Sequence, residues 1–252
     1  MTQMRTIRIA GITFLVLAAV TLACAVWRVL RASCKPPSMP YGNPKLRGPH
    51  TVVAWCSEPL DDLKIAAAEL DSILLYSKCG RVPPPLPPNV SVKMLANVGS
   101  CDNAWLQYII ENYDALPPAV LFTKPDMIGW PPKNVCETSA STIGSFHLAD
   151  YKFRHNPVDR PELQFRPSGF RDMREWAAAQ GEWAPTLLAL IDRPIASWIG
   201  GNNLVTVRQI RSQPIGLYRY LRGLQTHANE EVDHFIERLW APMLCPAEVA
   251  PR

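Results

Sequence analysis

The sequence predicts an α/β fold with a mostly parallel sheet and helices on both of its faces. Short apolar runs of strand length recur in the first half of the chain, and segments with apolar residues at helical spacing lie between them. Strands that are apolar throughout are typical of parallel sheets that helices cover on both sides. In such sheets, ligands bind outside the carboxyl ends of the strands.

Four strands and two helices are predicted in the first half. The predicted strands are Thr51–Cys56, Ser72–Ser77, Val90–Leu95 and Ala119–Thr123. The pattern predicts one helix at Leu60–Leu70 and another at Asp102–Tyr113, where Trp105 and Ile109 recur on one face. Residues 83–88, which are almost all proline, predict a polyproline-like loop before the third strand.

The second half is less regular. Residues 127–159 are rich in Pro, Gly, Ser and Thr and predict a long loop, which in a compact domain is more often functional than idle. Helices are predicted at Asp172–Gln180 and Trp183–Leu190. A short apolar run, Leu204–Val207, precedes two further helices at about 208–224 and 229–240.

Residues 9–29 are predicted to form a transmembrane signal anchor behind a short cytosolic tail, residues 1–8. The stretch Ile9–Trp27 has no charged residue, and about 20 apolar residues cross a bilayer core as a helix. A cleaved signal peptide is the alternative, since Ala23 and Ala25 lie near its end, although such apolar regions usually span about 7–15 residues.

A single domain is predicted after the anchor. Residues 30–49 are rich in Pro and are predicted to form a stem, and no second linker of that composition divides residues 50–245. Residues 246–252 form a tail. The net charge of +4 comes from scattered basic residues without a clustered stripe, so nucleic acid is not an expected partner.

Three features favour a single-pass type II protein of the endoplasmic reticulum or Golgi with its body in the lumen. They are the anchor, a glycosylation sequon at Asn89, and six of the seven cysteines beyond the anchor. An even number is compatible with three disulfides, while several free thiols are the alternative. No C-x-x-C spacing indicates a metal or redox site.

Three motifs resemble those of an uncharacterised eukaryotic family, common in fungi and algae. The chain reads N-V-G-S-C-D from Asn97 and Y-I-I-E-N-Y-D from Tyr108, and it closes on E-R-L-W from Glu237. Family members read N-V-G-R-E, then Y-I-I-x-N-Y-D and E-R-L-W. The order of elements is similar to that of nucleotide-sugar glycosyltransferases. The resemblance therefore implies a glycosyltransferase-A-like fold, with a nucleotide sugar and Mn²⁺ or Mg²⁺ as candidate cofactors.

Two departures from that pattern weigh against transfer activity. Ser100 and Cys101 stand where the family has Arg-Glu, so a guanidinium for a phosphate and a carboxylate for a proton are both missing. No Asp-x-Asp follows a strand, although hard cations need convergent carboxylates. No metal ligands are therefore assigned.

The donor-binding candidates are Asn97, Gly99 and Lys78. Asn97 and Gly99 open a predicted helix, and a helix N-terminus next to a glycine is a natural anion site. The alternative is that Gly99 provides a turn and that Asn97 or Asp102 caps the helix. Lys78 directly follows the second strand, where it could meet a phosphate or could simply be solvated.

The catalytic candidates are Glu237, His147 and Asp150. Glu237 matches the closing motif, and its alternative role is an ion pair or a buried structural contact. His147, Asp150 and nearby His155 lie in the long loop, where a general base could stand above the strand ends. We therefore expect a glycosyltransferase-like protein with a glycan or glycoprotein acceptor. The alternative is a catalytically inactive lumenal domain that binds glycans or a partner.

Overall fold

A six-stranded sheet, in the order β3-β2-β1-β4-β6-β5, carries the structure. The strands are β1 His50–Trp55, β2 Ile73–Ser77, β3 Val90–Met94, β4 Ala119–Thr123, β5 Lys133–Asn134 and β6 Asn202–Thr206. This computed structural model describes residues 50–129, 133–134, 148–153, 165–193 and 202–245. The expected anchor, stem and C-terminal tail lie outside the described residues. Within those residues, no helix is long and apolar enough to cross a membrane.

The sheet is mostly parallel, as predicted. β1 pairs in parallel with β2 and with β4, and β2 pairs in parallel with β3. β6 runs antiparallel to β4, and the short β5 pairs with it in parallel. All four strands predicted in the first half are confirmed. The strand β6 begins two residues before the apolar run at 204–207, because the buried Asn202 and Asn203 also pair with β4.

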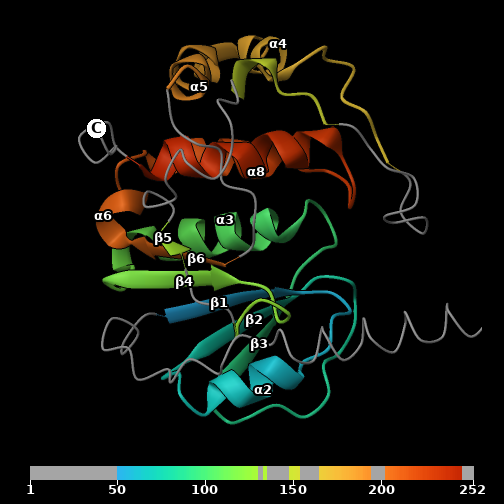
Figure 1. The fold of residues 1–252 in the computed structure, drawn as a ribbon, viewed down its shortest axis with the longest axis vertical. Coiled ribbons are helices and arrows are strands. Elements are labelled where there is room, and N and C mark those ends of the chain that lie inside the picture. Colours follow the sequence, from blue (N-terminus) through green and yellow to red (C-terminus); the bar gives the residue numbers. More distant parts are fainter. Residues whose placement is uncertain (1–49, 130–132, 135–147, 154–164, 194–201, 246–252) are drawn as a thin grey trace, which may run out of the picture. The chain divides into compact units, whose positions relative to one another are not determined.

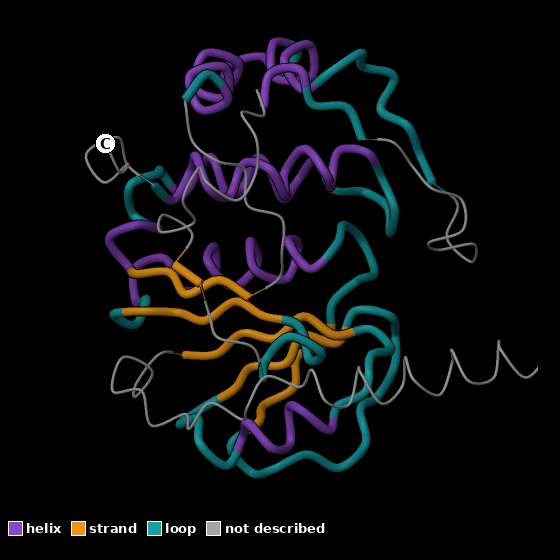
Figure 2. Tube along the Cα trace, in the orientation of Figure 1, coloured by secondary structure: helices purple, strands orange, loops and turns teal. Residues whose placement is uncertain are grey.

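Helices cover both faces of the sheet (Figure 1). α2 (Asp61–Ala67) lies on one face, and α3 (Cys101–Asn112) and α8 (Glu231–Leu244) lie on the other. α4 (Met173–Ala178) and α5 (Ala184–Ile191) lie beyond α8. Figure 2 shows the same alternation of strand and helix along the trace.

The last two predicted helices have different bounds in the structure. The segment predicted as one helix at 208–224 is two, α6 (Val207–Ile210) and α7 (Ile215–Leu224), because Pro214 stands at the N-cap of α7 and proline cannot continue a helix. α8 runs to Leu244, beyond the predicted end at Trp240. Its last turn is buried, so tertiary packing extends it.

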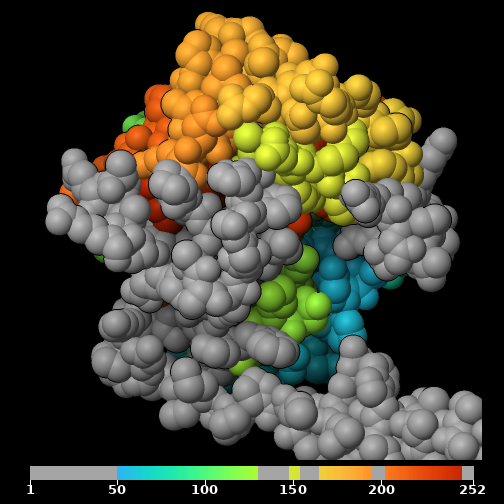
Figure 3. Space-filling view, turned by 45° about the horizontal axis from the view of Figure 1, so that its top comes forward, coloured from blue at the N-terminus to red at the C-terminus, as the bar shows by residue number. Residues whose placement is uncertain are grey.

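Short 3₁₀ turns complete the described structure. They are η1 (Tyr113–Ala115), η2 (Leu148–Asp150) and η3 (Gly181–Trp183). η2 is followed by Tyr151, whose carbonyl accepts a hydrogen bond from the Met173 N–H at 2.8 Å. Figure 3 shows this part of the long loop, in yellow-green, against the segment that carries α4 and α5.

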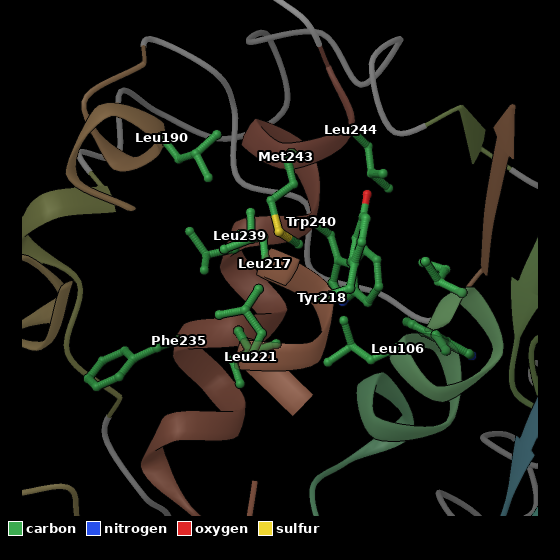
Figure 4. Close-up of a cluster of buried hydrophobic side chains, with 14 of the residues drawn as sticks. Leu106, Leu190, Leu217, Tyr218, Leu221, Phe235, Leu239, Trp240, Met243 and Leu244 are labelled. Carbon is green, nitrogen blue, oxygen red and sulfur yellow. The ribbon is translucent and has the colours of Figure 1, made fainter. Parts of the chain in front are cut away.

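Two hydrophobic clusters hold the layers together. The larger lies between the sheet and α3, α7 and α8, and Figure 4 shows part of it around Tyr218 and Trp240. Trp105 is buried there, with its ring 5.9 Å from those of Phe122 on β4 and Trp240 on α8. The expectation that Trp105 packs α3 on the sheet is confirmed. The smaller cluster packs Leu63 and Ala66 of α2 on the other face.

Candidate functional site

A cavity of about 300 Å³ opens at the carboxyl ends of β1, β2 and β4 and reaches the N-terminus of α3. Its walls come from Ala54–Glu58 at the end of β1, from Lys78, Cys79 and Arg81 after β2, from Asn97 and Gly99–Cys101 at the start of α3, and from Lys124 after β4. From β1 the chain continues to β2 on one side, and β4 lies on the other side. In an α/β sheet, the place where the strand order reverses is the expected ligand site.

A disulfide forms part of the cavity wall. Cys56 and Cys79 each follow a strand closely, and their bond joins the ends of β1 and β2 with the Cα atoms 5.0 Å apart. Cys245 is also disulfide-bonded. Cys101, in contrast, is a free thiol. The six cysteines beyond the predicted anchor therefore do not form the three disulfides that their even number would allow. Burial raises the pKa of this thiol to about 12, which leaves it protonated and weakly nucleophilic at neutral pH.

Lys124 and Arg81 supply positive charge to the cavity. Neither side chain forms an ion pair with another described residue. The sulfur of Cys101 and the carboxylates of Asp102 and Glu237 raise the pKa of Lys124, against the effect of its burial. Lys124 therefore carries its charge at neutral pH. Its position directly after a parallel strand is the signal that could have identified it from the sequence.

Glu58 places a carboxylate at the end of β1. Its Oε2 accepts hydrogen bonds from the backbone N–H groups of Cys56 and Ser57, both at 3.0 Å. Burial acts to raise the pKa of Glu58, but these donors and the charge of Lys124 more than offset it, so the pKa lies below its ordinary value. The carboxylate is thus ionised. It accepts from two backbone N–H groups that could otherwise donate to a bound anion.

Lys78 does not have the exposed position expected for a phosphate ligand. Its side chain is buried, and its Nζ donates to the carbonyls of Val98 at 2.8 Å, Gly99 at 2.7 Å and Ser100. Three converging carbonyl oxygens form a site for a cation, and the ammonium group fills it. Lys78 therefore positions the loop before α3, and its ammonium group is directed at that loop.

The loop before α3 needs Gly99. Its φ is +62°, and a Cβ there would lie 2.6 Å from Nε2 of Gln225. The Gly99 N–H donates to the His227 carbonyl at 2.6 Å, so this donor already has a partner. The cap of α3 is Ser100, whose side chain accepts from the Asp102 N–H, and neither Asn97 nor Asp102 fills that role. Asn97 is exposed and lines the cavity.

Glu237 lies near the cavity without lining it. It is on α8, on the same face of the sheet as α3, and binds the guanidinium of Arg238 at 2.8 Å. Nδ1 of His234 lies 3.7 Å from the same carboxylate. Burial favours a higher pKa, but these two partners outweigh it, so the pKa of Glu237 lies below its ordinary value. Glu237 in turn raises the pKa of Asp102 and Lys124, which indicates electrostatic contact with the cavity.

The remaining candidates that the structure describes, Asp150 and Asn89, do not line this cavity. Asp150 is exposed on η2 and does not line the cavity. His147 and His155 lie outside the described residues. Asn89 is partly buried, and its Nδ2 donates to the carbonyls of Ala67 at 2.7 Å and Leu70 at 2.8 Å. Both amide hydrogens thus hold the end of α2, which opposes attachment of a glycan to this nitrogen.

The carboxylates near the cavity do not fit a divalent metal. Glu58 accepts hydrogen bonds from the backbone, and Asp102 accepts hydrogen bonds from Ser100 and from the indole of Trp240. Within the described ranges, no three His, Cys, Asp or Glu side chains are grouped so that they could hold a metal ion. No step through Mg²⁺ or Mn²⁺ is therefore derived from these residues.

The cavity joins three of the residues predicted from the sequence, Asn97, Gly99 and Lys78, with three that were not predicted, Glu58, Arg81 and Lys124. It is suited to hold an anionic group, since Lys124 and Arg81 line it and neither forms an ion pair with a residue that the structure describes. Comparison of the chain with family models, with curated proteins and with solved structures finds no match in any of the three.

Proposed function

We propose that the cavity at the carboxyl ends of β1, β2 and β4 binds the phosphate groups of a nucleotide sugar. In this proposal the protein is a membrane-anchored, glycosyltransferase-like protein of the secretory pathway with a glycan or glycoprotein acceptor. The observation that carries it is the pair of cations, Lys124 and Arg81, that line the cavity and form no ion pair within the described part of the chain. Phosphate oxygens are the acceptors that such side chains bind best.

The size and place of the cavity support the same class of ligand. About 300 Å³ is at the lower end of the range for small-molecule sites, so it suits the phosphate part of a larger ligand whose remainder extends outward. Asn97, which is exposed at the cavity wall, could then contact the sugar or base. The Cys56–Cys79 disulfide supports an oxidising compartment, as expected for a lumenal body.

Ligand-dependent melting tests the proposal. A panel of nucleoside diphosphate sugars, with and without Mn²⁺, should raise the melting temperature of the purified protein by mass action. Lys124→Gln should abolish that shift, because it removes the charge and leaves the strand end in place. Lys64→Gln, at an exposed position of α2, is the matched control and should keep the shift. If no sugar nucleotide shifts the melting temperature, or if both variants respond alike, this proposal fails.

The second candidate is a lumenal domain that binds glycans or a partner and has no catalytic activity. The identity of Ser100 and Cys101 favours it, since the first caps α3 and bonds to Asp102 and the second is a protonated thiol. Neither can replace the Arg-Glu pair of the family that the sequence resembles. Donor binding without any release of nucleoside diphosphate in the presence of acceptor glycans would support this candidate.

A further inference from the structure

Residues 81–88, R-V-P-P-P-L-P-P, connect β2 to β3 and form neither helix nor strand. Proline fixes φ near −65° and forces the residue before it into an extended conformation. Five of these eight residues are proline, and no cis peptide bond occurs among the described residues. These constraints favour the polyproline II conformation, which has three residues per turn, over residues 82–87, and the segment ends in a turn at Pro88 and Asn89.

The exposure of the segment follows that period. Pro83 and Leu86 are partly buried, and Leu86 packs against the smaller core cluster under α2. Val82, Pro85 and Pro88 are exposed, and Val82 has 85% of its surface accessible. One edge of the segment thus rests on the domain, while a row of apolar residues three apart faces solvent.

Both ends of the segment are fixed by hydrogen bonds. The hydroxyl of Ser77 donates to the Arg81 carbonyl at 2.6 Å, and the Val90 N–H donates to the Pro87 carbonyl at 3.0 Å. A peptide held in its extended form before binding loses little conformational entropy when a partner takes it up. The segment is therefore preorganised as a ligand.

We propose that residues 81–88 are a docking segment for a partner domain with an aromatic-lined groove that recognises polyproline II helices. Pro84, which is exposed, and Pro87, which is partly buried, lie on one edge at an interval of three, which gives the P-x-x-P spacing that such grooves bind. Arg81 lines the cavity and is not part of this docking edge. The partner is thus defined as a domain with an aromatic-lined groove.

Titration of the full-length chain in detergent with three purified domains tests the proposal. The probes are an SH3 domain, a WW domain and an EVH1 domain, which represent such grooves in vitro, so the test does not depend on the compartment of the protein. We expect saturable binding to at least one of them, competition by a synthetic peptide of residues 81–88, and a loss of at least about tenfold in affinity for Pro84→Ala and Pro85→Ala. Pro118→Ala, at an exposed proline between η1 and β4, should bind like the wild type.

The substitutions leave Arg81 in place, so this test does not depend on ligand binding in the cavity. Circular dichroism and melting of each variant check that the fold is kept, as expected for residues whose side chains face solvent. The proposal is overturned if none of the three domains binds at concentrations up to about 1 mM, or if Pro84→Ala and Pro118→Ala bind equally well.

Discussion

The indole Nε1 of Trp240 donates a hydrogen bond to Oδ1 of Asp102, across 138 residues of sequence. Asp102 belongs to the first turn of α3, at the end of the loop that forms one wall of the cavity, and Trp240 belongs to the closing E-R-L-W motif on α8. Burial and the charge of Glu237 raise the pKa of Asp102. The hydrogen bonds from Ser100 and Trp240 act in the opposite direction and stabilise the ionised carboxylate. The two sequence motifs are therefore parts of one buried polar contact.

Gly99→Ala should destabilise the protein more than an ordinary substitution of a glycine with positive φ. The new Cβ would meet the Gln225 side chain at 2.6 Å in addition to the backbone strain. We expect a loss of about 2–4 kcal/mol in the free energy of unfolding, measured by urea denaturation. Gly181→Ala is the control, since its φ is +55° and nothing lies near its added Cβ, and it should cost only about 1 kcal/mol. Equal costs would contradict the packing argument.

Lys78→Met should loosen the loop before α3, because three backbone carbonyls lose their donor. We expect a loss of about 2–3 kcal/mol in the free energy of unfolding and faster hydrogen exchange at residues 99–101. Lys93→Met removes an ion pair with Glu111 whose lysine is half exposed, so it should cost less than about 1 kcal/mol. If the exchange rates at residues 99–101 do not change in Lys78→Met, the ammonium group does not organise this loop.

Asp233 should make stability depend on pH. Burial, together with the charges of Asp102 and Glu230, raises its pKa from 3.8 to about 7. A raised carboxyl pKa means that the folded state keeps a proton that the unfolded state releases. The free energy of unfolding should therefore fall as the pH rises from about 4 to about 7. Asp233→Asn should remove most of this fall and gain about 2–4 kcal/mol relative to wild type at pH 8.

Denaturation curves at intervals of pH between 4 and 8 measure the effect of Asp233. Asn retains an oxygen that can accept from the Gln225 amide, but its NH₂ group cannot accept from the Glu230 N–H as Oδ2 does, so the variant loses one of the two hydrogen bonds. Asp61→Asn, at an exposed position of α2, is the control and should follow the wild-type curve. A parallel pH dependence in Asp233→Asn and wild type would exclude this residue as the cause.

Asn89 should carry no glycan in the folded protein, in contrast to the expectation from its sequon. Its two amide hydrogens donate to the carbonyls of Ala67 and Leu70, and a glycan would displace one of them. Ser91→Ala destroys the sequon but keeps this amide, and we expect no change in electrophoretic mobility or in sensitivity to endoglycosidase. Asn89→Ala should lower the free energy of unfolding by about 1–2 kcal/mol. A mobility shift that disappears in Ser91→Ala would show that the site is used.

Glu237→Gln tests the catalytic proposal separately from binding. If Glu237 is the general base of a transferase, the variant should lose about 10²–10⁴ in turnover while sugar nucleotides still raise its melting temperature. Glu182→Gln, exposed on η3, is the control. A lower melting temperature with normal turnover would instead assign Glu237 to the contact with Arg238.

Local pattern was sufficient to predict the central part of the fold. β1, β2, β3, β4 and α3 follow from short apolar runs and from the spacing of Trp105 and Ile109, which depend only on neighbouring residues. The direction of β6 could not be predicted, because it is set by pairing with β4 and not by its own sequence. The break at Pro214 was missed, although proline is a local signal.

The cavity lies at the strand ends, where ligands are expected in a sheet of this kind, and three of the residues predicted from the sequence line it, whereas Glu237 and Asp150 do not. Parallel strands end at a common edge, so the position of the cavity, Asn97 and Gly99 followed from the strand order. The burial of Lys78 could not be predicted, since it depends on carbonyls that lie 20 to 22 residues away. Glu58 and Lys124 follow strands in the same way as Lys78. Their roles depend on contacts with the backbone and with α3, which the sequence does not reveal.

The Cys56–Cys79 bond also has a consequence for the unfolded chain. It closes a loop across 23 residues that contains α2 and β2, and its two ends follow strands that are parallel partners. A covalent loop of this length reduces the conformational freedom of the denatured ensemble by about 3 kcal/mol. Parallel strands need a long crossover and pair slowly. Oxidation of these two thiols during synthesis would therefore hold the first crossover closed before the rest of the sheet has assembled on it.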